Sequence, residues 1–109
     1  MLKVDVNSVA DVVRELARGH IAAETRHDGF TTWFVRASGF SIEIFDDAGK
    51  VDYVERVTDP SGKTATFQQF INAVGYDPID QLSEPDQNGL SDRMRGDYWG
   101  GMIAKKKKR

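Results

Sequence analysis

The sequence predicts an α+β fold, with an N-terminal helix, a three- to four-stranded antiparallel β-meander, and C-terminal helices packed on the sheet. Near the N-terminus, apolar side chains recur at helical spacing, whereas residues 31–58 alternate apolar and polar side chains as half-buried strands do. Turn residues separate these alternating segments. Because a sheet needs a cover, we expect the apolar residues after position 66 to supply it.

The N-terminal helix is predicted over residues 9–18. Its apolar face follows the spacing i, i+3, i+4, i+7 and i+8, which places Val9, Val12, Val13, Leu16 and Ala17 on one side. Ser8 can cap this helix, with Asp11 at the capping-box position three residues later. Gly19 provides the left-handed residue at which helices commonly end.

The first strands follow this helix. Ile21 and Ala23 can open an edge strand, and Asp28-Gly29 is a signal for a two-residue type I′ hairpin turn. Residues 31–37 are rich in β-branched and aromatic side chains and predict the next strand. We expect its alternate residues Trp33, Val35 and Ala37 to share one face.

Residues 40–63 are the centre of the predicted meander. A strand with alternating Phe40, Ile42 and Ile44 leads into turn residues at 46–50. In the next strand, strict alternation predicts that one set of side chains shares a face: Val51, Tyr53, Glu55 and Val57. The segment 59–62, Asp-Pro-Ser-Gly, closes the unit as a turn.

Three helical segments are predicted after the sheet. Thr66 caps the first, Gln69 completes its capping box, and Gly75 ends it. Its apolar face consists of Phe67, Phe70, Ile71 and Val74. Asp77-Pro78 begins a short turn of helix whose Ile79 and Leu82 are expected in the core. Residues 83–86 begin another helix, with Leu90 and Met94 as its apolar residues and Gly89 as a weak point.

Length and composition are typical of one soluble domain. The chain has 109 residues and no cysteine, which excludes disulfides, thiolate metal sites and cysteine nucleophiles. We expect residues 1–96 to form the domain and residues 97–109 to be a flexible aromatic, glycine-rich and basic tail. With no membrane-spanning run and no secretion signal, we expect a cytoplasmic protein.

The charge is unevenly distributed. The last five residues are all basic, whereas the first 104 carry ten Lys or Arg against 17 Asp or Glu, a formal charge of −7.

Four short segments stand out together: Ile42-Glu43-Ile44-Phe45-Asp46-Asp47, Val51-Asp52-Tyr53, Asp59-Pro60-Ser61-Gly62-Lys63 and Asp77-Pro78-Ile79-Asp80-Gln81-Leu82-Ser83. They resemble the segments "l-x-l-f-n-D", "L-D-Y", "P-D-G-R" and "D-P-v-x-L-L-S" of a family of small uncharacterised proteins, common in pseudomonads, called DUF7693. The chain departs from the family in lacking its usual cysteines and in having a tail after Gly96. The resemblance implies an α+β fold, a bacterial origin and no assigned activity.

Two segments can be compared with cation sites. Residues 84–95 have acids, amides and Gly89 at the positions of a calcium loop, but Arg95 stands where a bidentate glutamate is required. A capped helix therefore explains them better. A dense acidic group, Asp46, Asp47, Asp52, Glu55 and Asp59, could bind a divalent cation or perform acid–base chemistry, with Asp46, Asp47 and Asp52 as the weak metal candidates. Solvated turn residues are the alternative.

No catalytic constellation is visible in the sequence. The two histidines, His20 and His27, form no metal-ligand pair and no recognisable triad, and the glycines form no phosphate-binding loop. We therefore expect no enzymatic activity and no cofactor.

The C-terminal segment is the strongest candidate for partner binding. Its aromatic and basic side chains are Tyr98, Trp99, Lys105, Lys106, Lys107, Lys108 and Arg109. Aromatics can stack on bases or anchor in a protein groove, and lysines neutralise phosphates or anionic lipid. The alternative is that the aromatics cover an exposed edge of the fold and the lysines only solubilise.

The leading functional hypothesis is a non-catalytic protein-binding or regulatory module. A second hypothesis is a phage-type inhibitor of a nucleic-acid-handling, anti-defence complex, in which the acidic body occupies a basic channel. A third is binding of nucleic acid or an anionic surface through the basic tail.

Overall fold

The computed structural model describes the backbone of residues 2–107 and the side chains of residues 2–96. The elements follow in the order α1 (Val6–Ala17), β1 (Glu24–His27), β2 (Thr32–Ala37), β3 (Phe40–Asp47), β4 (Lys50–Thr58), β5 (Thr64–Thr66), α2 (Phe67–Val74), η1 (Pro78–Gln81) and α3 (Glu84–Lys107).

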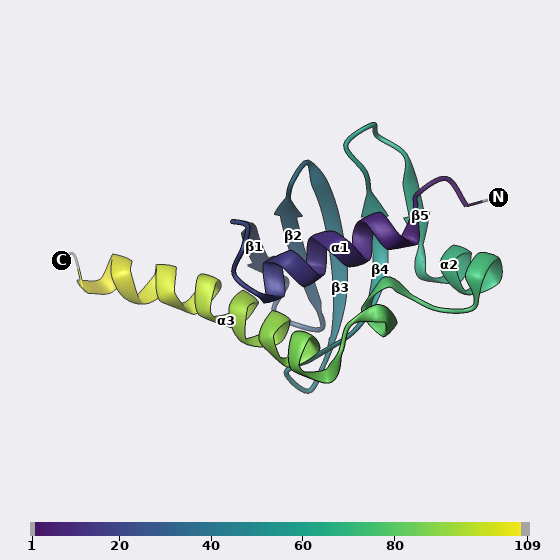
Figure 1. The fold of residues 1–109 in the computed structure, drawn as a ribbon. Coiled ribbons are helices and arrows are strands. Elements are labelled where there is room, and N and C mark those ends of the chain that lie inside the picture. Colours follow the sequence, from purple (N-terminus) through teal and green to yellow (C-terminus); the bar gives the residue numbers. More distant parts are fainter. Residues whose placement is uncertain (1, 108–109) are drawn as a thin grey trace.

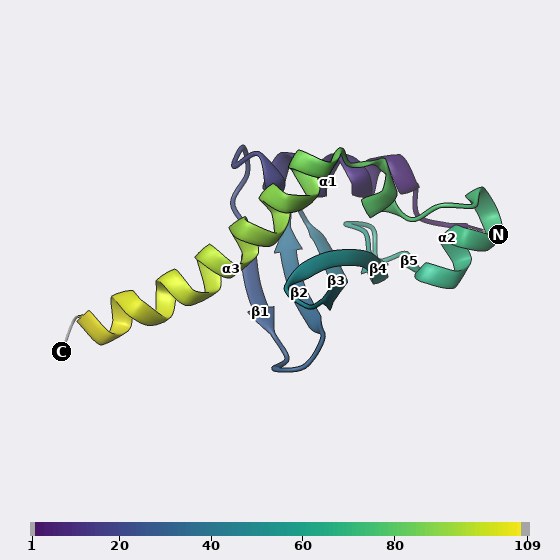
Figure 2. The same cartoon turned by 90° about the horizontal axis from the view of Figure 1, so that it is seen from below.

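The structure confirms the α+β fold and the antiparallel meander, with a fifth strand added. The sheet order is β1-β2-β3-β4-β5, and every neighbouring pair is antiparallel. Helix α1, η1 and the first part of α3 lie on one face of the sheet, and α2 lies beside β5 (Figure 1, Figure 2). The sequence does not predict strand β5, because its three residues are too few to show an alternating pattern.

Helix α1 begins earlier than predicted. Its cap is Asp5 rather than Ser8, because the Asp5 carboxylate accepts the Asn7 N–H at 3.0 Å. Ser8 lies inside the helix and donates its hydroxyl to Asp5 at 3.1 Å. The earlier start adds Val6 to the buried face of the helix.

The turn between β1 and β2 also differs from the prediction. Residues 28–31 form a four-residue loop, closed by a hydrogen bond from Asp28 N–H to the Thr32 carbonyl at 3.1 Å. Asp28 does not adopt the positive φ that a type I′ turn needs at that position. Its carboxylate instead accepts hydrogen bonds from the loop backbone, and this capping favours the longer turn.

Strand β4 does not alternate as predicted, because two β-bulges interrupt its pairing with β3. The register shifts between Glu43 and Ile44 and again between Phe45 and Asp46. Each shift leaves one extra residue on β4 and reverses the direction of the side chains that follow. As a result, the buried residues of β4 are every third one: Val51, Val54 and Val57.

Helix α2 has the predicted capping box. The Thr66 hydroxyl accepts the Gln69 N–H, and the Gln69 side chain accepts the Thr66 N–H at 2.9 Å. Gly75 ends the helix with a φ of 83°. Of the predicted apolar face, however, only Phe70 is fully buried, since the helix lies at the edge of the sheet rather than across it.

The last two helical segments confirm the remaining core predictions. Ile79 and Leu82 are buried around η1, and Leu90 and Met94 are buried beneath α3. The backbone of α3 remains helical to Lys107, beyond Gly96. The division into a domain and a flexible tail stays a prediction.

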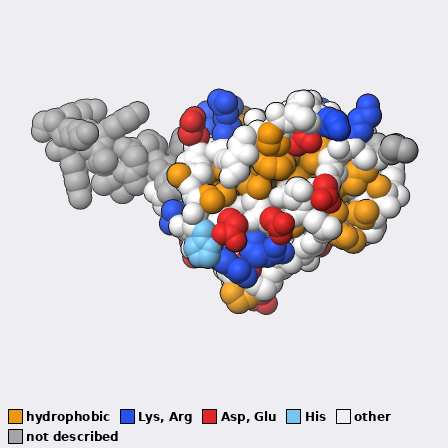
Figure 3. All heavy atoms as spheres, turned by 45° about the horizontal axis from the view of Figure 1, so that its top comes forward, with side chains coloured by type: hydrophobic (Ala, Val, Ile, Leu, Met, Phe, Trp, Pro, Cys, Tyr) orange, Lys and Arg blue, Asp and Glu red, His pale blue; other side chains and the backbone are white. Residues whose placement is uncertain are grey.

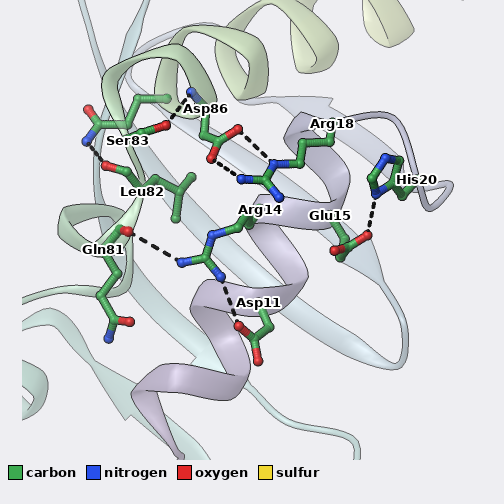
Figure 4. A network of polar contacts seen from close by, with 10 residues as sticks. Asp11, Arg14, Glu15, Arg18, His20, Gln81, Leu82, Ser83 and Asp86 are labelled. Atoms are coloured by element: carbon green, nitrogen blue, oxygen red, sulfur yellow. Dashed lines mark hydrogen bonds and ion pairs between the residues drawn. The ribbon is translucent and has the colours of Figure 1, made fainter.

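Polar contacts join α1 to η1 and to the first turn of α3 (Figure 4). Arg18 binds the Asp86 carboxylate with two nitrogens, at 3.0 and 3.1 Å, and Arg14 donates to the Gln81 carbonyl at 3.4 Å. The hydrogen bond from Arg18 holds the pKa of Asp86 below its ordinary value. The Glu15 carboxylate forms a hydrogen bond of 2.7 Å with Nδ1 of the His20 ring.

Gly89 lies where α3 passes closest to the end of α1. A Cβ at this position would lie 3.0 Å from the backbone oxygen of Ala17. We expect Gly89→Ala to destabilise the protein by about 1 kcal/mol, because overpacking outweighs the better helix propensity of alanine. Gly96→Ala in the same helix meets nothing within 4 Å and should be neutral or stabilising. Urea unfolding of both variants checks this, and a stabilised Gly89→Ala would contradict it.

Candidate functional site

On β1–β3, one face of the sheet is left open by the described helices, and it carries the charged residues of these strands; at β4, Phe67 of α2 packs on Tyr53. Cross-strand register aligns two rows on this face. The first row runs Arg26, Phe34, Glu43 and Arg56 across β1 to β4, and the second runs Glu24, Arg36, Ser41 and Thr58. We call the part of these rows on β1–β3 the open sheet face.

The open sheet face has an aromatic centre surrounded by charges. The Arg26 guanidinium lies 4.4 Å from the centre of the Phe34 ring, at cation–π distance. A shallow hollow of about 450 Å³ lies between the long side chains, with Arg36 and Glu43 among its walls. Among the described side chains, neither Arg36 nor Glu43 forms an ion pair within 4.0 Å. This surface can therefore offer both signs of charge to a partner.

The tip of the β1–β2 hairpin projects a single large apolar side chain. Phe30 is 84% exposed, whereas the other exposed large hydrophobics among residues 2–96, Val74 and Tyr76, reach 38% and 37%. Phe30 is not among the candidate residues that the sequence pattern predicts. The available signal was an aromatic residue directly after the turn residues Asp28-Gly29, where a polar residue is usual.

Hydrogen bonds hold the backbone of this tip in one conformation. One oxygen of Asp28 accepts the N–H groups of Phe30, Thr31 and Thr32 at 2.7, 3.1 and 3.1 Å. These bonds, the one from Phe30 foremost, lower the pKa of Asp28. The Gly29 N–H is bound by His27 Nδ1 at 3.0 Å. Phe30 is therefore presented on an ordered loop.

His27 fills a structural role beneath the tip. Its Nδ1 accepts the Gly29 N–H, so the proton of the neutral ring lies on Nε2. Nε2 is buried without a hydrogen bond and lies 3.6 Å from an Asp46 oxygen, too far for one. The ring contacts Trp33 edge-on, with centroids 4.6 Å apart. These contacts account for the position of the His27 side chain in the fold.

The acidic residues near the β3–β4 turn have separate surroundings. Asp46 faces His27, Asp47 is paired in register with Lys50, and Asp52 is exposed. Among the side chains that the structure describes, no group of three or more His, Asp or Glu residues could hold a metal ion. Asp59 accepts from the Ser61 hydroxyl and from two backbone N–H groups, which lowers its pKa and identifies it as a turn residue.

Asp77 is the one buried acid in the described part of the chain, at 1% exposure. Its two oxygens accept the Val54 N–H at 3.0 and 3.1 Å, and Oδ2 also accepts the Ile79 N–H at 2.9 Å. Burial raises the pKa of Asp77 to about 7. Because backbone donors occupy the carboxylate, its role is to join η1 to β4.

Residues 84–95 are not a calcium loop, since they lie within helix α3. A calcium loop needs a turned backbone that directs its oxygens inward. Here the Asp86 carboxylate instead binds Arg18, and Arg95 donates to the Gly49 carbonyl at 2.6 Å.

The predicted partner-binding side chains of the C-terminal segment lie outside the described side chains. These are Tyr98, Trp99, Lys105, Lys106, Lys107, Lys108 and Arg109. On the side of the body seen in Figure 3, basic and acidic side chains are interspersed and no large area has one sign. No helix within the described residues combines the length and apolar character required to cross a membrane.

Comparison with known families gives one match. The model of a family described as Domain of unknown function (DUF7693) matches residues 3–96. The chain belongs to DUF7693. No curated protein and no solved structure matches it.

The motifs of this DUF7693 chain correspond to identifiable structural features. The segment at 59–63 is the β4–β5 turn held by Asp59, and the segment at 77–83 contains the buried carboxylate of Asp77. Asp52, in the Asp-Tyr motif, lies at the second bulge of β4. These residues hold turns, a bulge and the contact between η1 and β4, and none of them lies on the open sheet face or at the hairpin tip.

Proposed function

We propose that this DUF7693 domain is a non-catalytic module that binds another protein, with Phe30 at the β1–β2 tip as its anchor. The observation that carries the proposal is a phenylalanine that is 84% exposed on an ordered loop. Transferring a phenylalanine side chain from water into a partner's pocket contributes roughly 1.5–3 kcal/mol. Aromatic anchors of this kind commonly dominate protein interfaces.

The ordered loop supports the proposal because it reduces the entropic cost of binding. A flexible loop would lose conformational freedom when its aromatic residue docks, which weakens the interaction. Here Asp28 and His27 already hold the backbone around Phe30 through four hydrogen bonds. The side chain is therefore presented in a geometry that a complementary pocket can accept directly.

We expect Phe30→Ala to abolish capture of the partner without lowering the stability of the fold, because the exposed ring buries little area in the free protein. The measurement is an affinity pull-down from the lysate of the source organism, followed by quantification of the retained protein. Val74→Ala is the matched control, since it truncates a less exposed apolar side chain on a different element and should leave capture unchanged.

The same experiment separates the other two hypotheses. A version ending at Ala104 removes the five terminal basic residues, and a nuclease arm removes nucleic acid. Binding lost with the tail or with nuclease would transfer the function to the basic segment. A basic partner that DNA competes away would instead support the inhibitor hypothesis. Turnover of any substrate by the purified chain would overturn the non-catalytic proposal.

A further inference from the structure

We propose that the open sheet face is a self-association surface, which packs against the same face of a second copy of this chain. The inference rests on the residues at 24, 26, 34, 36, 41 and 43 and is independent of Phe30. It begins from the fact that the described helices cover only the opposite face of these strands (Figure 2). In a sheet with one buried face, the other normally carries solvated polar residues; here it also carries a central phenylalanine.

The arrangement of charges is complementary to itself. Along β1, Glu24 and Arg26 follow one another on the open face, so this strand carries both signs of charge. Consider a two-fold axis that lies between the two facing sheets. It runs perpendicular to the strands, midway between the two rows, so that it brings the first row of one copy over the second row of the other. It places Glu24 opposite Arg26 of the second copy, and Arg26 opposite its Glu24.

The central strands fit the same operation. Arg36 comes to lie over Phe34 of the second copy, which is a cation–π arrangement, and Ser41 comes to lie against Glu43. On β4 the axis places Arg56 opposite Thr58, which is neutral. Directly opposed side chains never carry the same sign of charge, and each contact occurs twice because the interface is isologous. Arg26, which lies over Phe34 in the single chain, turns to Glu24 of the second copy in this arrangement and leaves the ring to Arg36.

Other occupants fit this face less well. An acidic peptide or a nucleic acid would meet Glu24 and Glu43 as well as the arginines, and the body of charge −7 would repel a polyanion. A second sheet can also fill the hollow between the long side chains. Side chains of facing sheets interdigitate when their strands lie within about 30° of one another.

The test uses two charge reversals in the full chain. Glu24→Arg leaves only positive charge in the outer pairs of a homodimer, and Arg26→Glu leaves only negative charge. We expect either variant alone to weaken dimerisation at least tenfold, because like charges then meet twice. An equimolar mixture of the two should dimerise as well as the wild type does, since every outer pair is again opposite in sign.

Sedimentation equilibrium over a range of concentrations measures association, and thermal unfolding confirms that each variant is folded. Arg56→Glu is the control, because it reverses a charge on the same face whose opposite residue, Thr58, is neutral, and it should leave association unchanged. The proposal is overturned by a wild type that stays monomeric at millimolar concentration, by a reversal variant that dimerises normally, or by a mixture that stays monomeric. Because Phe30 takes no part, the pull-down result can succeed or fail separately.

Discussion

Replacing Asp77 with alanine is expected to destabilise the domain by about 3 kcal/mol. The carboxylate is the acceptor for two buried backbone N–H groups, those of Val54 and Ile79, at 2.9–3.1 Å. Alanine leaves both amides without an acceptor in a site that is closed to solvent, and each such loss costs about 1–3 kcal/mol. Urea unfolding measures the difference in the free energy of unfolding.

A nearby exposed aspartate provides the control for this substitution. Asp52 lies on the same strand as Val54 but is exposed, so Asp52→Ala should change stability by no more than about 0.5 kcal/mol. If Asp77→Ala cost no more than Asp52→Ala, the carboxylate would not be the group that joins η1 to β4.

The buried carboxylate of Asp77 should also make the stability of the domain depend on pH. Burial raises its pKa from 3.8 to about 7, so the folded state binds this proton more tightly than the unfolded state does. The resulting stabilisation is complete below pH 3.8 and is lost as the pH rises through 7. We expect the stability of the wild type to fall between about pH 5 and pH 8 more steeply than that of Asp77→Asn, which keeps an acceptor but does not titrate. Identical slopes would contradict the raised pKa.

Phe70→Ala is expected to cost about 4 kcal/mol, within the range for truncating a buried phenylalanine. Phe70 is fully buried and is the one residue that α2 contributes to the core. Removing it leaves a cavity beneath the helix and weakens the neighbouring contact between Phe67 and Tyr53, whose ring centroids are 4.4 Å apart. Thermal or urea unfolding of the full chain gives the loss.

Val74→Ala, in the same helix, separates burial from helix propensity. Val74 is 38% exposed, so its truncation removes little buried surface, and alanine favours the helix more than valine does. We expect a change below about 1 kcal/mol. Equal losses for the two variants would show that α2 is held by its whole apolar face, as the sequence pattern alone predicts.

Local patterns account well for the ends and types of the elements. The capping box at Thr66, the turn at Asp59 and the start of η1 at Asp77 were all predicted, because each depends on residues no more than four positions apart. Where two local signals competed, the prediction was wrong. Ser8 and Asp5 both suit a helix cap, and the helix capped by Asp5 also buries Val6 in the core.

Strand β4 shows what local patterns cannot determine. Strict alternation predicted Tyr53 beside Val51 and Val57, but two bulges place Val54 there instead. A bulge is a property of the pair of strands, and its position depends on which residues of β3 lie opposite. The same bulged segment holds the Val54 N–H that Asp77 accepts, so this contact was equally hidden from the sequence.

The sequence by itself determined an α+β domain, the helix caps at Thr66 and Asp77, the turn at Asp59, the membership of DUF7693 and the absence of cysteine chemistry. The tertiary structure decided which faces are covered, and hence which polar residues are buried or presented. Asp77 is the predicted cap of η1 and is also a buried carboxylate, and Phe30 is the exposed tip of an ordered loop. Burial and exposure arise from contacts between segments distant in the chain, such as β4 with η1, and local periodicity carries no information about them.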